Sequence, residues 1–254
     1  MELISQAAEA KIYKQESPEG AFVIKDRISK GYRHPELDKK IIKQRTKREA
    51  KLLEKANKLI NSPASELIEQ NKIKMPFIEG KKLSENLENL DWKNLCIEIG
   101  NKIALLHDND IIHGDLTTSN MILADSSNNE KLSQLKKLKA DKESSNLNNK
   151  NKREAEFVQA SSKNRAEGEA NFKEVDSKEP LGVLHFIDFG LGFISKRIED
   201  KAVDLHLIKQ ALEAKHFSIH KEAEKIILDN YNSKDKSKVL EQLKKVELRG
   251  RYRH

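Results

Sequence analysis

The chain has 254 residues, of which 37% are apolar and 35% are charged, and its formal net charge is +7. This length and apolar share allow one or two domains with a buried core, and the positive charge favours polyanionic partners. Cys96 is the single cysteine, which excludes an internal disulfide, and neither a signal peptide nor a membrane-length apolar run is present, so we expect a cytoplasmic or nuclear protein.

Two segments near the N-terminus predict strands of a small sheet. Residues 2–13 and 21–27 carry β-branched and aromatic side chains, and a Ser-Pro-Glu-Gly turn lies between them. Lys25 follows the apolar run AFVI, which resembles the V-A-I-K strand whose lysine holds nucleotide phosphates in kinases. Because most lysines at strand ends are only solvated, this role for Lys25 depends on a partner.

A kinase carries a glycine-rich loop over the phosphates in its N-terminal sheet, but this chain has no glycine at the corresponding place. Residues 6–10 read QAAEA. Without glycines the backbone cannot fold as closely over the phosphates, so contact with a nucleotide must use another geometry.

Residues 35–60 predict a long helix, and Glu49 lies on its apolar face. The apolar residues that share this face are Leu52, Leu53, Ala56, Leu59 and Ile60. A carboxylate in such a place needs a cation. Lys25 is one candidate, and a local pair with Arg45 or Lys55 fits the spacing equally well.

Residues 66–70 and 73–78 predict two further strands that end at Glu79 and Gly80. In a kinase this exit is the hinge whose backbone meets adenine, and a plain hairpin exit is the alternative. The candidate hinge residues are Met75, Phe77, Ile78 and Glu79.

Asp91 then caps a second predicted helix. Its apolar face consists of Trp92, Leu95, Ile99, Ile103 and Leu106.

Two short motifs farther along the chain predict phosphoryl-transfer chemistry. Residues 111–123 contain Asp115 and, five positions later, Asn120, the D-x-x-x-x-N spacing of a kinase catalytic loop, and residues 185–190 present Asp188 in a D-F-G tripeptide. Asp115 suits the carboxylate that orients the attacking hydroxyl, and Asn120 and Asp188 suit the oxygen ligands that hold Mg²⁺ on ATP. A D-F-G tripeptide alone also ends strands in other proteins, so the two motifs together carry the prediction.

Residues 125–180, between these two motifs, are rich in Asn, Lys, Ser and Glu. Such a segment has too little apolar surface to offset its ordering entropy, and we expect a disordered insertion in the turn between the motif strands. The turn can accept it because the cost of loop closure grows slowly with length.

The chain after Gly190 is short, and apolar faces over residues 203–212, 217–231 and 239–246 predict a reduced helical lobe. No A-P-E motif follows, and Gly114 replaces the arginine of H-R-D, so we expect no switching by loop phosphorylation. Asp204 is expected either to cap a helix or to contact the catalytic-loop backbone. The whole pattern predicts one α+β domain over 1–254 with a bilobal protein-kinase-like fold, its N-lobe at 1–78 and its C-lobe at 79–254.

These motifs resemble one family, the small atypical serine/threonine kinase subunit of the KEOPS (EKC) complex, which is related to the RIO kinases. The matching runs include residues 32–38, 113–120, 187–192 and 248–251. The resemblance implies Mg-ATP use, largely as an ATPase, in threonylcarbamoylation of the adenosine beside the anticodon of tRNA. It also implies binding to the threonylcarbamoyltransferase subunit and other KEOPS subunits. Ala7, where the family usually has glycine, and the insertion depart from the pattern.

Two other classes remain open on the sequence. Aminoglycoside and choline kinase-like phosphotransferases share H-G-D-x-x-x-x-N and I-D-F and would imply a small-molecule acceptor, although they usually have a larger helical lobe. A tRNA-binding or scaffolding subunit with a vestigial site is the non-enzymatic alternative. Against that alternative stands the presence together of Lys25, Glu49, Asp115, Asn120 and Asp188.

The C-terminal tail carries Arg249, Arg251 and Arg253 together with Tyr252, beyond the last predicted helix. Arginine offers several planar donors to phosphate, and a tyrosine ring can stack on bases. The tail is therefore predicted to contact tRNA or a partner, and a solvated, frayed terminus is the alternative.

Overall fold

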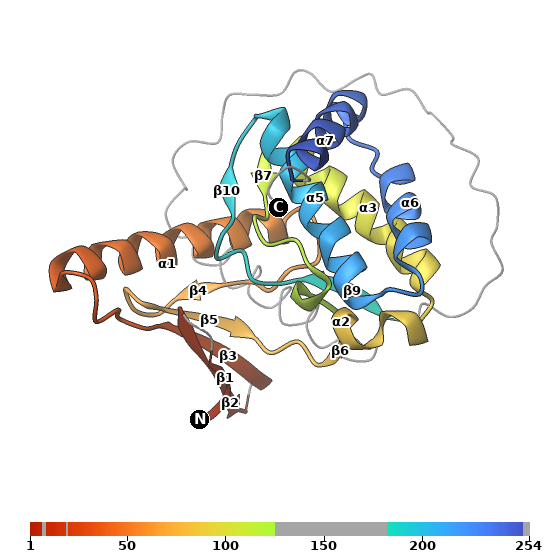
Figure 1. Cartoon of the computed structure of the whole chain (residues 1–254). Helices are drawn as coiled ribbons and strands as arrows, with labels where there is room; N and C mark the ends of the chain where they lie inside the picture. The colour runs from red at the N-terminus through yellow and green to blue at the C-terminus, as the bar shows by residue number, and fades with distance from the viewer. Residues whose placement is uncertain (7–8, 19, 125–181, 251–254) are drawn as a thin grey trace, which may run out of the picture. The chain divides into compact units, whose positions relative to one another are not determined.

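The computed structural model describes residues 1–6, 9–18, 20–124 and 182–250, and the predicted insertion at 125–180 lies outside them. In the described part, an antiparallel sheet and one long helix come first, and several helices follow (Figure 1). This composition of elements confirms the α+β class predicted from the sequence.

Five strands form the N-terminal sheet in the order β1-β2-β3-β5-β4, and every neighbouring pair is antiparallel. The strands are β1 (Glu2–Gln6), β2 (Ala10–Ser17), β3 (Gly20–Arg27), β4 (Glu66–Leu67) and β5 (Lys72–Pro76). β3 occupies the middle, where Lys25 pairs with Ile12 of β2 and with Ile73 of β5. The central position fixes the direction of the Lys25 side chain from both sides.

Two strand predictions need correction. The segment 2–13 is not one strand, because the chain reverses after Gln6 and β1 pairs with β2. The strand predicted at 66–70 is shorter, since the backbone groups of Glu69 and Lys72 bond to each other in a tight turn that ends β4 early. The strand predicted at 73–78 is β5, which begins one residue earlier, at Lys72, and ends at Pro76.

Helix α1 (Pro35–Asn57) has a proline in its first turn, where no donor is lost. Asp38 ties that turn to the preceding loop, because its carboxylate accepts bonds from Ser29 Oγ at 2.6 Å, the Lys30 N–H at 3.0 Å and Arg33 Nη1 at 3.2 Å. The helix ends at Asn57 rather than at residue 60, since the next backbone N–H groups turn back to Ala56 in a tighter bend.

The helical part is built around α3 (Trp92–Asp108), which buries its predicted face of Leu95, Ile99, Ile103 and Leu106. Asp91 caps α3 as predicted, accepting from the Asn94 N–H at 3.4 Å. Gly100 allows a close approach, because a Cβ there would lie 2.5 Å from the carbonyl oxygen of Ile227. The other helical elements of the described residues are α2 (Leu83–Asn86), the 3₁₀ turns η1 (Leu87–Asn89) and η2 (Thr118–Asn120), α5 (Ile198–Lys215), α6 (His220–Asp229) and α7 (Lys236–Gly250).

Short strands hold the two motif loops. β7 (Ile111–Ile112) pairs with β10 (Phe193–Ile194), and β8 (Met121–Ala124) pairs with β9 (Val183–Phe186), both antiparallel. β6 (Gly80–Lys82) extends the second pair on the β8 side. The catalytic loop therefore runs from β7 to β8 and the D-F-G segment runs from β9 to β10, so the same two strand pairs fix both.

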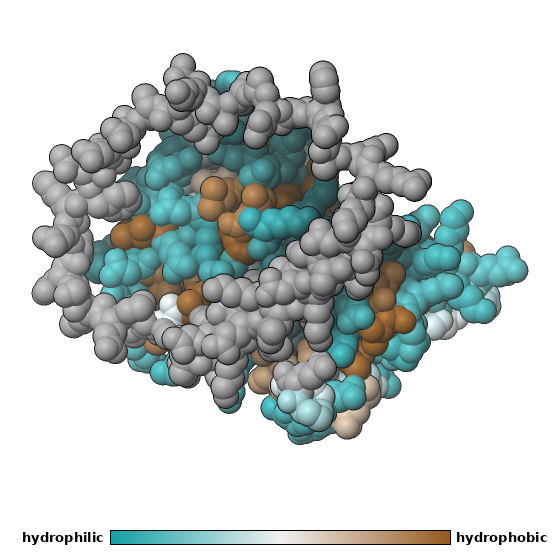
Figure 2. All heavy atoms as spheres, turned by 180° about the vertical axis from the view of Figure 1, so that it is seen from behind, coloured by the Kyte–Doolittle hydropathy of each residue, from teal (hydrophilic) through white to brown (hydrophobic). Residues whose placement is uncertain are grey.

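On the face opposite to that of Figure 1, the visible described residues are mostly hydrophilic, and hydrophobic side chains gather in separate patches (Figure 2). This surface agrees with a charged fraction of 35%. None of the helices in the described ranges is long and apolar enough to cross a membrane.

Candidate active site

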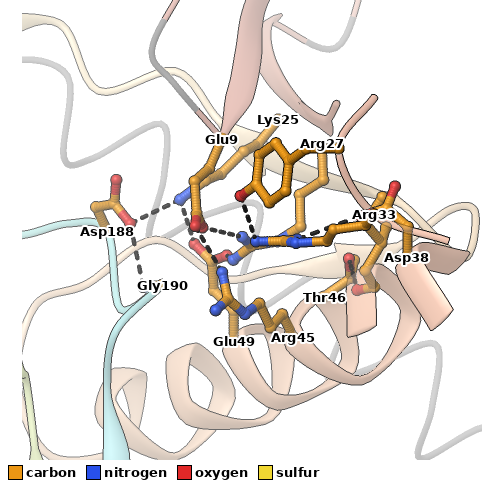
Figure 3. Close-up of polar contacts among 12 residues, drawn as sticks. Glu9, Lys25, Arg27, Arg33, Asp38, Arg45, Thr46, Glu49, Asp188 and Gly190 are labelled. Carbon is orange, nitrogen blue, oxygen red and sulfur yellow. Dashed lines mark hydrogen bonds and ion pairs between the residues drawn. The ribbon is translucent and has the colours of Figure 1, made fainter. Parts of the chain in front are cut away.

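Lys25 lies at the centre of a group of charged side chains that joins β3, α1 and the D-F-G segment (Figure 3). Its Nζ donates to Glu49 Oε1 at 2.7 Å and to Asp188 Oδ1 at 2.6 Å. The side chains of Lys25 and Glu49 are 9% and 1% exposed. The cation that the apolar face of α1 requires at Glu49 is thus Lys25, with Arg27 as a second, whereas Arg45 donates to Glu9 instead.

Lys25 and Asp188 keep each other ionised. Burial by itself lowers the pKa of the Lys25 ammonium, but the Glu49 and Asp188 carboxylates raise it, and the net pKa is above the ordinary value. Burial by itself raises the pKa of the Asp188 carboxyl, but Lys25 and the Gly190 N–H lower it, and the net pKa is below the ordinary value. The buried Lys25–Glu49 pair leaves an uncompensated charge if either partner is removed.

Asp188 is held in an unusual backbone conformation, with φ of 59°. A non-glycine residue in the left-handed region is strained unless its surroundings hold it there. Here Asp188 Oδ1 accepts from the Gly190 N–H at 3.1 Å as well as from Lys25, and Phe189 is fully buried beside it. The carboxylate remains 45% exposed, so its second oxygen can reach a ligand.

Asp115 and Asn120 contact each other across the catalytic loop. Asn120 lies in the 3₁₀ turn η2 (Thr118–Asn120), and its Nδ2 donates at 2.9 Å both to the backbone oxygen and to Oδ2 of Asp115. The Ile187 N–H donates to the Asn120 carbonyl oxygen at 2.9 Å, which joins the two motif loops. The spacing of the catalytic-loop motif therefore places an amide and a carboxylate side by side.

The oxygen atoms of Asp188 and Asn120 fit a magnesium ion. Asp188 is an ionised, partly exposed carboxylate, and the amide of Asn120 donates toward Asp115, which directs its oxygen away from that residue. Mg²⁺ usually takes one or two protein oxygen ligands and completes its shell with phosphate and water. Across the described ranges no group of three or more His, Cys, Asp or Glu side chains could hold a metal ion.

Asp204 of α5 holds the backbone of the catalytic loop. Its carboxylate accepts from the backbone N–H of His113 at 2.7 Å and of Gly114 at 2.8 Å, and it is 1% exposed. Because α5 begins at Ile198, Asp204 is inside the helix and does not cap it. Of the two expected roles, contact with the loop backbone is the one observed. His107 Nε2 lies 3.3 Å from the same carboxylate, a neighbour that the sequence did not indicate.

Gly114 occupies a backbone position that excludes a side chain. Its φ is +76°, and a Cβ there would lie 2.5 Å from the carbonyl oxygen of Leu191. An arginine, as in H-R-D, does not fit without movement of this loop. The glycine that distinguishes this motif from ordinary protein kinases thus has a direct structural cause.

His113 joins the two motifs through its ring. The ring is buried and lies 4.5 Å from the ring of Phe189, Nε2 is 3.1 Å from the Ile187 carbonyl oxygen, and Nδ1 accepts from the Asp115 N–H at 3.4 Å. These contacts require the neutral tautomer with the proton on Nε2. Burial lowers the pKa of His113 below its ordinary value, which favours the same neutral form.

The burial of neutral His113 predicts that the folded protein loses stability in acid at pH values above those at which carboxylates titrate. Below the unfolded pKa of about 6.5 the unfolded chain binds a proton at His113 that the folded chain does not, so stability falls as pH falls. We expect a lower Tm at about pH 5.5 than at about pH 7.5. The pKa of His216 is lowered by burial as well and contributes in the same direction.

The measurement is Tm against pH for wild type and His113→Asn. The variant is expected to be less stable at neutral pH but to show a flatter dependence on pH. The same replacement at His34, an exposed residue before α1, is the control and should keep the wild-type dependence. An equally steep dependence in wild type and His113→Asn would contradict this account.

Of the candidate hinge residues, Met75 lies in β5, and Phe77, Ile78 and Glu79 lie between β5 and β6. Met75 pairs with Val23 of β3, and the Phe77 N–H donates to the Ala21 carbonyl oxygen at 2.9 Å. Ile78 and Glu79 follow and lead directly into β6 at Gly80. This segment is the connection from the N-terminal sheet to the part of the chain that carries the catalytic loop, as the hinge prediction requires.

The C-terminal tail begins later in the chain than the sequence predicted. Helix α7 extends to Gly250, so Arg249 lies inside the helix, where its Nη1 donates to Glu199 Oε1 of α5 at 2.6 Å. Arg251 and Arg253 lie outside the described residues. Arg249 therefore has a structural partner, and only the two later arginines belong to the predicted tail.

The sequence did not indicate two charged residues of the site, Glu9 and Arg27, and it offered Arg45 only as an alternative partner of Glu49 (Figure 3). Arg27 Nη2 donates to Glu49 Oε2 at 2.5 Å, so Glu49 binds two cations of β3 at once. The sequence does contain a pattern that identifies Arg27 as a neighbour of the site, because Arg27 is two positions after Lys25 and projects from the same face of the strand.

Comparisons with known proteins agree with this geometry. A family model described as the RIO domain matches residues 6–132. The chain is 35% identical to the KEOPS complex subunit Bud32 of Pyrococcus abyssi, over 100% of the chain and 97% of that protein. It is 34% identical to a probable bifunctional tRNA threonylcarbamoyladenosine biosynthesis protein of Methanobrevibacter smithii, over 99% of the chain but 37% of that longer protein.

A solved structure supports the fold. The Rio2 kinase of Chaetomium thermophilum, solved as an ADP/Mg²⁺-phosphoaspartate complex, superimposes with a TM-score of 0.51 at 14% sequence identity, covering 98% of this chain and 72% of that one. This likeness confirms the kinase-like fold predicted from the sequence motifs. With identity that extends over the full length of an archaeal relative and a matching domain model, the chain belongs to the Bud32 family of RIO-type atypical kinases.

Proposed function

We propose that this protein is a Mg-ATP-dependent phosphotransferase that acts largely as an ATPase and has serine/threonine kinase specificity. The observation that carries the proposal is the position of Lys25 Nζ, 2.7 Å from Glu49 and 2.6 Å from Asp188. In kinases this lysine–glutamate pair and the D-F-G aspartate must be in place together for phosphoryl transfer.

Each residue has a definite task in this proposal. Lys25 binds the α- and β-phosphates of ATP, and the main chain of residues 75–79 meets adenine. Asp188 and Asn120 hold Mg²⁺, which supplies positive charge against the phosphate oxygens. Asp115 orients the attacking hydroxyl or water, and the Asn120 amide fixes its carboxylate at 2.9 Å.

The names of the relatives indicate the complex and the process in which this activity takes place. One relative is a KEOPS complex subunit and another acts in tRNA threonylcarbamoyladenosine biosynthesis. We infer that this chain is likewise a KEOPS/EKC subunit that binds the threonylcarbamoyltransferase subunit and supports the modification of tRNA in the cytoplasm or nucleus. These names favour this role over a small-molecule phosphotransferase.

The test is Mg²⁺-dependent phosphate release by the purified protein, alone and with the transferase subunit and tRNA. We expect turnover that requires Mg²⁺ and that rises when the complete complex binds tRNA. Stimulation by an aminoglycoside or choline but not by tRNA would favour the small-molecule alternative. A folded wild-type protein without any turnover would leave only the scaffolding role.

The same assay tests the tail. Truncation after Gly250 removes Arg251 and Arg253 but keeps α7 and the Arg249–Glu199 pair. We expect weaker tRNA binding by the complex, a flatter dependence of affinity on salt, and lower tRNA-stimulated turnover. With fewer arginine–phosphate contacts, fewer counterions are released from the tRNA on binding. Equal affinity and equal salt dependence in the two complexes would mean that the tail does not contact tRNA.

A further inference from the structure

The segment between α6 and α7 is attached to the end of α3 and to α5. Ser233 Oγ donates to Asp108 Oδ1 at 2.6 Å, and the Lys234 N–H donates to the two oxygens of the same carboxylate at 3.0 Å and 3.3 Å. Asp108 is the last residue of α3. On the other side, the buried Lys201 of α5 has its Nζ 3.8 Å from Asp235 Oδ2. These contacts hold the segment beside the last turn of α3.

Tyr231 lies in this segment, and its side chain is completely buried. Its hydroxyl oxygen is 2.8 Å from Nδ1 of His107, and the two rings meet at 74° with their centroids 5.5 Å apart. Burial raises the pKa of the Tyr231 hydroxyl above its ordinary value, so the hydroxyl keeps its proton at neutral pH and can donate to Nδ1. The proton of the His107 ring is then on Nε2, because the hydrogen bond at one ring nitrogen determines the state of the other.

Nε2 of His107 faces the carboxylate that holds the catalytic loop. It lies 3.3 Å from Asp204 Oδ2, which also accepts from the His113 N–H at 2.7 Å, while Oδ1 accepts from the Gly114 N–H at 2.8 Å. Asp115 is the next residue of the loop. A rotation of the Asp204 carboxylate would therefore release the N–H groups of the two residues directly before Asp115.

We propose that Tyr231 is a positioning residue for the catalytic loop. Its hydroxyl orients the His107 ring, and that ring orients the Asp204 carboxylate. The orientation of this carboxylate determines where the loop backbone lies, and with it Asp115. The inference rests on the proposed function for the task of Asp115. Tyr231 does not itself touch the reacting atoms, and it connects the C-terminal helices to the loop that carries them out to the acceptor.

The alternative is that Tyr231 only fills the hydrophobic core. Its ring does belong to the buried cluster of the helical part. Its hydroxyl, however, is the only hydrogen-bond partner of His107 Nδ1 among the residues that the structure describes. Tyr231→Phe separates the two roles, because it keeps the ring and removes the hydroxyl.

The first measurement is amide hydrogen exchange at His113 and Gly114, whose N–H groups donate to Asp204. We expect Tyr231→Phe to make their exchange about fivefold to tenfold faster relative to that of amides inside α3, as the loss of one buried hydrogen bond allows. Referring the rates to α3 removes the effect of a change in global stability. The measurement needs neither a nucleotide nor turnover.

The second measurement is steady-state phosphate release by Tyr231→Phe with ATP as the varied substrate. We expect kcat to fall about threefold to tenfold and KM for ATP to change by less than about twofold. The reason for this difference is that Asp115 orients the acceptor, whereas Lys25 and Asp188 hold the nucleotide and bond to each other elsewhere in the site.

Ile227→Val is the matched control. Ile227 belongs to α6, is 1% exposed and lies in the same buried cluster as Tyr231, but its side chain makes none of these hydrogen bonds. The loss of one buried methylene costs about as much stability as the loss of one hydrogen bond. This variant should therefore have a lower Tm but the kcat and relative exchange rates of wild type. If Tyr231→Phe matches it in both, Tyr231 only fills the core and the proposal is overturned.

A double-mutant cycle tests whether Tyr231 acts through His107. His107→Leu by itself should lower kcat and speed the exchange at Gly114, and adding Tyr231→Phe should have no further effect, because the hydroxyl then has no ring nitrogen to orient. Additive effects would overturn the proposal. If His107→Leu does not fold, the relative exchange rates in Tyr231→Phe still decide it. If wild type turns over no ATP, the proposed function fails, and the same exchange rates decide whether Tyr231 positions the loop.

Discussion

Asp188→Ala should abolish Mg²⁺-dependent ATP turnover, with a loss of at least about 100-fold. The substitution removes the ionised carboxylate that fits Mg²⁺, and it removes one of the two acceptors that hold Lys25 Nζ at 2.6 Å and 2.7 Å. A methyl group replaces neither contact. The measurement is steady-state phosphate release with varied Mg²⁺, together with ATP affinity from direct binding.

The comparison variant is Asp115→Asn, which changes charge with little change of shape. Its backbone oxygen still accepts from Asn120 Nδ2, and its own side-chain oxygen can accept the second bond of 2.9 Å. We expect turnover to fall while ATP affinity stays close to wild type, because Asp115 orients the acceptor and does not hold the nucleotide. Wild-type turnover and affinity in Asp188→Ala would refute the assignment of this site.

Gly114→Ala should destabilise the protein by roughly 3 kcal/mol, the second large effect that we expect. The residue has φ of +76°, and a Cβ would lie 2.5 Å from the Leu191 carbonyl oxygen, so either the catalytic loop or the segment after D-F-G must move. For a domain of this size a loss of that magnitude corresponds to a fall in Tm of about 6–12 °C. Thermal unfolding measures it.

Gly31→Ala is the matched control for that experiment. Gly31 precedes α1, no heavy atom lies within 4 Å of a Cβ there, and its φ is outside the left-handed region that glycine favours. Its Tm should stay within about 2 °C of wild type. If Gly114→Ala melts like Gly31→Ala and keeps its activity, the loop can accept a side chain, and the H-G-D glycine has no structural cause.

Periodicity and motif spacing predicted the parts of the site that a local pattern can encode. Glu49 was identifiable because a carboxylate on the apolar face of a helix needs a cation, and Lys25 because it follows an apolar strand. The pairing of the two was still undecided, since Arg45 and Lys55 satisfied the same spacing. Only the register of β3 beside α1 decides it, and register depends on contacts between distant segments.

The residues that were missed are those whose role depends on such distant contacts alone. Glu9 lies 36 positions from its partner Arg45, and His107 lies 97 positions from Asp204. No periodic pattern connects them. The strand predicted at 66–70 was too long for a different reason, because a short turn in which the backbone groups of Glu69 and Lys72 bond to each other ends β4 early, and an apolar pattern does not report such a turn.

The pairing of β8 with β9 has a consequence for how the chain can be divided. Ala124 and Val183 are partners in adjacent strands, so the chain leaves the site and returns to it at neighbouring points. The catalytic loop belongs to the piece before this point, and the D-F-G segment belongs to the piece after it. The two pieces are therefore held together by antiparallel strand pairing and by buried ion pairs, and not only by the peptide chain that links them. Two polypeptides, ending at Ala124 and beginning at Val183, would contain every charged residue from Glu9 to Asp188 that forms the site, and their joining would by itself assemble it.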